Sequence, residues 1–131
     1  MIVYLILVGL FLHIIADYIL QTSFMANTKQ RKWWKDNYPD EKYRFDWLIM
    51  LFLHSFEWTV CVMLPIALYR IFTVGTSLVE AILVSAFVVI NTVIHMWIDD
   101  MKANQLRISL TQDQLVHIVQ IIITTLILYF I

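Results

Sequence analysis

The stretch that decides the fold is Ile2–Leu20, which reads IVYLILVGLFLHIIADYIL. It is almost wholly apolar and long enough to cross a bilayer, because a spanning helix needs about 20 such residues. Three further stretches qualify in the same way, and they are 47–71, 78–98 and 114–131. The first of these contains Pro65, where we expect a kink. The sequence therefore predicts an all-α fold, an integral membrane four-helix transmembrane bundle that forms one domain over residues 1–131.

The composition excludes an ordinary soluble domain. Apolar and aromatic residues make up 61% of the chain, the mean hydropathy is +0.77 and 15% of residues are charged, whereas soluble domains have about 25% charged residues. The net charge of -1 provides no basic field, so nucleic acid is excluded as a partner. The single Cys61 excludes a disulfide framework and a multi-cysteine zinc site. Because Ile2–Leu20 lacks a basic segment before it and a small-residue cleavage site after it, we expect a true span rather than a signal peptide.

Lysine and arginine residues indicate the orientation in the membrane. Eight of the nine basic residues fall in the first and third connections between spans, and only Arg70 falls near the second connection. We therefore predict a protein of the bacterial inner membrane with both termini outside and with loop 21–46 and the third connection in the cytoplasm. Aromatic residues accompany the basic ones in and beside this loop, and they are Trp33, Trp34, Tyr38, Tyr43 and Trp47. The loop is interpreted either as a topology anchor or as a surface that attracts anionic headgroups.

Every predicted span contains one histidine with a carboxylate on the same helical face. Spacings of three and four residues place two side chains on one face of a helix. The pairs are His13 with Asp17, His95 with Asp99, Asp113 with His117, and His54 with Glu57. Because an Asp at the centre of a spanning helix costs about 2.5–3.5 kcal/mol, these pairs point to a function.

The order within the pairs follows the direction of the spans. Spans one and three run inward and read His then Asp, whereas span four runs outward and reads Asp then His. All three Asp residues are therefore expected nearer the cytoplasm, with their His partners about 6 Å deeper at 1.5 Å per residue. His54 reaches the same depth from the second span. We expect one layer of imidazoles under one layer of carboxylates in the cytoplasmic half of the bundle.

These two layers predict a divalent metal site. A single pair is interpreted as an interhelical hydrogen bond, but three carboxylates and four imidazoles together would repel one another or become protonated without a cation. Imidazole and carboxylate suit zinc first, with manganese and iron as alternatives, and the number of ligands allows one or two ions. The predicted metal ligands are His13, Asp17, His54, His95, Asp99, Asp113 and His117.

Further polar residues extend the predicted site. An Asp that does not bind the metal is a candidate general base, which makes Asp17, Asp99 and Asp113 predicted catalytic residues. Lys102 is the fourth predicted catalytic residue. Lys102 and Lys29, close to the membrane surface, are expected to hold an anionic substrate group. Residues that support the site or contact substrate are Gln21 and Asn91 on the polar helix faces, and Glu57 beside His54. Asn91 is also interpreted as an interhelical hydrogen-bonding residue.

At these residues the sequence resembles a family of small bacterial and phage membrane proteins called domain of unknown function 3307. The shared motifs are His13-x-x-x-Asp17-Tyr-Ile-Leu-Gln21-Thr, then Lys29, His54, His95-x-x-x-Asp99 with Lys102, and Asp113-Gln114-x-x-His117. The resemblance implies Gln21, Lys29, Lys102 and Gln114 as further site residues, and the family has no established activity. A weaker similarity to predicted membrane-bound metal-dependent hydrolases implies a hydrolytic reaction.

We expect an intramembrane metal-dependent hydrolase that acts on a phosphoester or acyl substrate reached from the cytoplasmic leaflet. One alternative is a transporter or channel component for a divalent cation or a proton, because buried Asp and His residues also mark ion pathways. The apolar outer halves of spans one and four argue against a pathway unless oligomerisation opens one. The other alternative is a metal-stapled interaction protein, such as a small subunit or a phage-encoded modulator. The expected partners are the lipid bilayer and a lipid or phosphoester substrate, and oligomerisation is left open.

Overall fold

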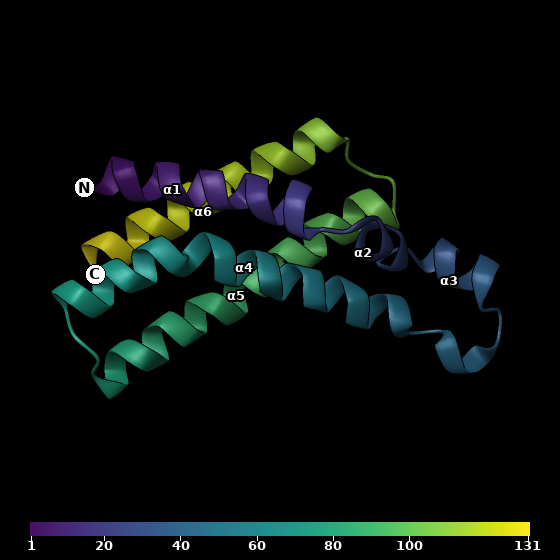
Figure 1. The fold of residues 1–131 in the computed structure, drawn as a ribbon, viewed down its shortest axis with the longest axis horizontal. Coiled ribbons are helices and arrows are strands. Elements are labelled where there is room, and N and C mark those ends of the chain that lie inside the picture. Colours follow the sequence, from purple (N-terminus) through teal and green to yellow (C-terminus); the bar gives the residue numbers. More distant parts are fainter.

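A computed structural model describes all 131 residues and contains helices without strands (Figure 1). The four long helical segments are α1 (Ile2–Ile15) with its continuation η1 (Ala16–Leu20), α4 (Asp46–Thr73), α5 (Leu78–Ala103) and α6 (Leu110–Phe130). Each is long and apolar enough to cross a membrane. The predicted all-α bundle with four spans is therefore confirmed.

The two ends of the bundle differ in composition. Both termini and the α4–α5 turn lie at one end, and the connections that follow η1 and α5 lie at the other (Figure 1). The second end therefore carries eight of the nine Lys and Arg residues, and we call it the loop end. Placement of the loop end in the cytoplasm stays a prediction from this charge distribution.

Three of the helices extend beyond the predicted spans. α4 begins at Asp46 and continues through Pro65 to Thr73. α5 continues past Ile98 to Ala103, and α6 begins at Leu110, before the predicted start at Gln114. The helices continue past the apolar residues that defined the spans, whose boundaries stay predictions, and α5 and α6 each begin at a serine cap.

The start of α6 shows such a cap. The Ser109 hydroxyl accepts from the Gln112 backbone N–H, and the Gln112 side chain accepts from the Ser109 backbone N–H. This reciprocal capping box satisfies two otherwise unpaired donors. Asp113 therefore lies within the first turn of α6, on the same helix as His117.

The connection between η1 and α4 folds against the bundle. It contains α2 (Ser23–Thr28), α3 (Arg31–Asn37) and the short 3₁₀ segment η2 (Glu41–Tyr43). Trp34 of α3 donates from Nε1 to the Thr28 carbonyl at 2.6 Å. The guanidinium of Arg31 lies 4.0 Å from the ring centroid of Trp47, at the start of α4. These contacts hold the aromatic part of the loop on the end of α4.

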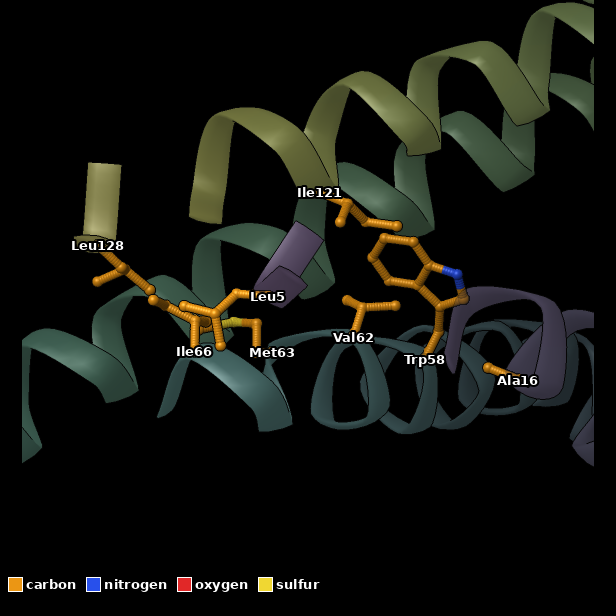
Figure 2. Packing of buried hydrophobic residues seen from close by; sticks show 8 residues of the cluster. All are labelled: Leu5, Ala16, Trp58, Val62, Met63, Ile66, Ile121 and Leu128. Atoms are coloured by element: carbon orange, nitrogen blue, oxygen red, sulfur yellow. The ribbon is translucent and has the colours of Figure 1, made fainter. Parts of the chain in front are cut away.

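The apolar core occupies the half of the bundle that faces the termini. Figure 2 shows its eight residues, which are Leu5, Ala16, Trp58, Val62, Met63, Ile66, Ile121 and Leu128. Gly9 lets α1 approach closely, because a Cβ at this position would lie 3.2 Å from Ile121 Cγ2. Ala16 and Trp58 lie at the loop end of this core (Figure 2), and Trp58 contacts the ring of His13 there.

A buried ion pair joins three helices near the termini. Arg70 of α4 pairs with Glu80 of α5, and its guanidinium also donates to the Leu128 carbonyl of α6. Leu128 lies in the last turn of α6, where carbonyl groups have no partner within the helix. Arg70 was expected near a turn, and the structure instead places it inside the bundle with 4% of its surface exposed.

Candidate functional site

The four spans bring the seven predicted ligand side chains together at the loop end of the core. None of these side chains is more than 11% exposed. His13 comes from α1, Asp17 from η1, His54 from α4, His95 and Asp99 from α5, and Asp113 and His117 from α6. We call this set the His/Asp cluster. The geometric grouping of the residues agrees with the sequence pattern, and their roles as metal ligands stay predictions.

Asp17 lies in a widened turn of the first span. Residues Ala16–Leu20 form a π-helix, and the Gln21 backbone N–H donates to the Ala16 carbonyl at 3.0 Å. Segments of π-helix inside longer helices are rare and frequently mark functional sites. The segment places Gln21 so that its side-chain nitrogen lies 3.1 Å from His54 Nε2.

Asp99 lies at the centre of the cluster and divides its two oxygens between two sets of partners. Its Oδ2 accepts from Lys29 Nζ at 2.5 Å and lies 3.5 Å from His54 Nε2. Its Oδ1 lies 3.5 Å from His117 Nε2 and 3.9 Å from His95 Nε2. The three imidazole contacts are longer than the 2.7–3.2 Å of a good N–H···O hydrogen bond.

Two lysines add positive charge to the cluster. Lys29 follows α2 and is buried against Asp99, whereas Lys102 of α5 donates to Asp113 Oδ2 at 2.5 Å. Both ammonium groups, which were expected to hold a substrate, are therefore paired with carboxylates. Two ammonium groups face three carboxylates, so with neutral imidazoles the cluster keeps an excess of negative charge.

His117 has no hydrogen-bond partner although it is fully buried. Its Nε2 lies 3.3 Å from Asp113 Oδ1 and 3.5 Å from Asp99 Oδ1. Both nitrogens of His117, and also Asp113 Oδ1, lack a hydrogen bond. Buried polar atoms without partners are rare in folded proteins, and an absent ion is one of their recognised causes.

Two groups of three side chains place ligand atoms within 4.8 Å of one another. The first is His95, Asp99 and His117, and the second is Asp17, His54 and His95. In the second group His54 Nε2 already accepts from the Gln21 amide. In the first group no hydrogen bond occupies His117 Nε2. The first group therefore has a free imidazole nitrogen, whereas in the second group the atom without a hydrogen bond is Asp17 Oδ1.

His13 has a different role from the other imidazoles. Trp58 donates from Nε1 to His13 Nδ1 at 2.8 Å, and an indole N–H can only donate. The proton of neutral His13 must therefore lie on Nε2, which donates to Gln114 Oε1 at 3.0 Å. The amide nitrogen of Gln114 then donates to Asp17 Oδ2 at 3.2 Å and to Asp113 Oδ2 at 3.1 Å. Through His13 and Gln114, the indole of Trp58 thus orients the carboxylates of Asp17 and Asp113.

Replacing Trp58 by Phe is expected to release His13 from its single tautomer, with a loss of about 1 kcal/mol of stability for the hydrogen bond. Phe keeps an aromatic ring against His95, which stacks on Trp58 with centroids 4.1 Å apart. Without the indole N–H, His13 Nδ1 becomes free to carry the proton and face Asp17 Oδ2, 3.6 Å away. Nitrogen NMR of the imidazoles in detergent measures the tautomer, and Trp47→Phe on the same helix is the control. An unchanged His13 signal in Trp58→Phe would contradict the assignment.

The remaining predicted residues lie outside the cluster. Glu57 is partly exposed and forms no ion pair or hydrogen bond with the cluster. Asn91 accepts from Gln120 and Thr124 at 2.9 Å, one step further toward the termini. The structure therefore places Asn91 in an interhelical hydrogen-bond network, as one of its two interpretations expected.

Sequence reasoning missed Trp58, which contacts His13 and His95 directly. A signal was present, because Trp58 follows His54 by four residues and so lies on the same face of α4. The depth of Lys29 had no comparable signal, since that residue lies outside every predicted span.

The fold and the cluster define a class of small all-helical protein with four potential membrane spans around a buried group of ionisable side chains. The chain belongs to the family described as Protein of unknown function (DUF3307), whose model matches residues 3–131. The resemblance found from the motifs is thereby confirmed, and the weaker similarity to hydrolases stays a prediction. No curated protein and no solved structure matches the chain.

Proposed function

We propose that the protein is a membrane-embedded, metal-dependent hydrolase that acts on a phosphoester or acyl bond from the loop end. One observation carries this proposal. The fully buried His117 Nε2, which has no hydrogen bond, faces two carboxylate oxygens, Asp99 Oδ1 and Asp113 Oδ1. Each carboxylate gives its other oxygen to a lysine. Asp113 Oδ1 is left without a hydrogen bond, whereas Asp99 Oδ1 also lies 3.6 Å from Lys102 Nζ.

The separations fit a metal better than a hydrogen-bonded pair. Tetrahedral zinc with bonds of about 2.0–2.2 Å to nitrogen and oxygen places neighbouring ligands about 3.3–3.6 Å apart. The contacts of His117 Nε2, at 3.3 and 3.5 Å, match this separation. We propose His95, Asp99 and His117 as the ligands, with the fourth position left to water and Asp113 beside it. Zinc comes first, with manganese or iron as alternatives. His13 is left out because both of its ring nitrogens are hydrogen bonded.

The residues around these ligands have the properties that hydrolysis needs. A divalent metal in such a site supplies a hydroxide nucleophile at neutral pH and polarises the scissile bond. Asp17 is a carboxylate outside the ligand set with a buried, unpartnered Oδ1, which makes it the candidate general base. The Lys102 side chain is 25% exposed, so its ammonium group can contact an anionic substrate while it stays paired with Asp113.

A transport pathway is the second candidate, and one observation favours it. The hydrogen-bonded residues Asn91, Gln120 and Thr124 carry polar groups from the cluster toward the termini. Beyond them lie the apolar core residues Leu5 and Leu128 (Figure 2). A site with this apolar core on its terminal side suits an enzyme better than a channel.

The test is elemental analysis of the protein purified in mild detergent without chelator. We expect about one equivalent of zinc, manganese or iron per chain, bound through three protein ligands and a water. Chelation should abolish hydrolysis of phosphodiester or ester probes such as bis(p-nitrophenyl) phosphate, and the same metal should restore it. Absence of metal after loading would contradict the proposal. Bound metal without turnover would favour transport, tested by uptake into proteoliposomes, or a metal-stapled interaction protein.

A further inference from the structure

A groove opens toward the outside of the bundle between α1 and α6. It has a volume of about 660 Å³ and is lined by Leu10, His13, Ile14, Tyr18, Gln114 and Ile118. Its walls are aliphatic and aromatic, and its polar lining residues are His13 and Gln114. Ligand pockets in proteins have volumes of about 300–1,000 Å³ with apolar walls and few polar groups. The groove therefore has the size and the lining of a binding site.

The polar lining of the groove belongs to the wall of the His/Asp cluster. His13 Nε2 and Gln114 Oε1 form a hydrogen bond of 3.0 Å. On its other side the Gln114 amide contacts Asp17 and Asp113, at 3.2 and 3.1 Å. One side chain thus separates the groove from the carboxylates of the candidate site.

The groove has the length of a lipid chain in one leaflet. From Leu10 to Tyr18 it extends about 12 Å along the first span at 1.5 Å per residue. One leaflet contributes about half of a hydrocarbon core that is about 30 Å thick. The groove begins at Tyr18, which is 62% exposed close to the loop end, and ends near the middle of the span.

We propose that this groove binds the hydrocarbon chain of a lipid from the leaflet at the loop end, and that the lipid's polar linkage lies at Gln114. This inference rests on the proposed function and names its substrate class, a phospholipid or a related amphiphile. The chain enters sideways from the bilayer, and the bond to be cleaved lies beside Asp17 and Asp113. The apolar walls bind the chain, and Gln114 sets the position of the linkage next to the two carboxylates that its amide contacts.

The test uses phosphatidylglycerol with a diazirine on its acyl chain, incorporated in nanodiscs with the full-length protein and mapped by mass spectrometry after irradiation. We expect labelling to concentrate on Leu10, Ile14 and Ile118. Ile118→Trp fills the groove and should reduce labelling of α1 several-fold. Leu115→Trp, on the same helix but outside the groove and 56% exposed, is the matched control. If Ile118→Trp does not fold, Ile14→Trp blocks the groove from the opposite wall.

Equal labelling of Leu115 and Ile118, or no change in Ile118→Trp, would overturn the inference. Elemental analysis of the same samples separates it from the proposed function. Concentrated labelling without bound metal would support the lipid site and contradict the hydrolase. Bound metal with even labelling would contradict the lipid groove alone and direct the search toward substrates that enter from water.

Discussion

Replacement of Asp99 by Asn is expected to remove the bound metal. It should also destabilise the protein by about 3–5 kcal/mol, because the buried ammonium group of Lys29 loses its carboxylate partner. Asp99 is 1% exposed and accepts from Lys29, which is itself 5% exposed. The amide of Asn keeps the size of the side chain but not its negative charge. Elemental analysis and thermal unfolding in detergent measure the two effects on one sample.

Two further variants separate the loss of metal from the loss of stability. Asp100→Asn is the matched control, since Asp100 is the next residue of α5 but contacts Asn104 and Gln105 instead of the cluster. The double variant with Lys29→Met removes both charges, and such replacements of a whole buried pair are often neutral in stability. We expect it to unfold close to the parent in chelator and still to bind no metal. Full metal occupancy in Asp99→Asn would contradict the proposed ligand set.

Replacement of His117 by Phe is expected to have opposite effects with and without metal. In chelator the substitution removes two buried nitrogens that have no hydrogen bond, so stability should be unchanged or higher. With metal at about 1,000 times its dissociation constant, the parent should gain about 4 kcal/mol. The variant has lost a ligand and should gain almost nothing. Thermal unfolding with and without zinc measures both differences.

His117→Leu accompanies this variant, because it is apolar without the bulk of the phenyl ring. Agreement between the two distinguishes loss of the ligand from crowding against His95, whose ring centroid lies 4.1 Å away. If both variants lose stability equally in chelator and in zinc, His117 contributes through hydrogen bonding or charge, and the cluster is a polar core rather than a metal site.

The arrangement of the spans could be predicted because it depends on one dominant quantity, the transfer of apolar side chains out of water. The segment Ile2–Leu20 was assigned from hydropathy alone, and the structure has a helical span over the same residues. Hydropathy could not locate the start of α6, because that start depends on the hydrogen bonds of Ser109 and Gln112. Arg70 was misplaced for a related reason, as its partner Glu80 lies on another helix.

The grouping of the His/Asp residues was accessible from spacing, because each pair lies within one helix. Contacts between elements were not accessible in this way. Lys29 reaches Asp99 only because the connection after η1 folds back into the bundle. The expectation that only a metal could balance the carboxylates overlooked this ammonium group. The charge excess that remains is smaller than the sequence suggested, and the free atoms around His117 are the stronger indication of a metal.

The burial of Lys29 also constrains how the chain can evolve. Asp17 and Lys29 lie on either side of the first turn after span one, and both are fixed in the same cluster, Lys29 through Asp99. The residues between them connect two fixed points, so an insertion or deletion there would move Asp17 or Lys29 out of the cluster. The exposed segment 38–42 carries no such restraint and can change in length. Length variation in this connection should therefore fall after Lys29, and the first half of the loop should be inherited as part of the site.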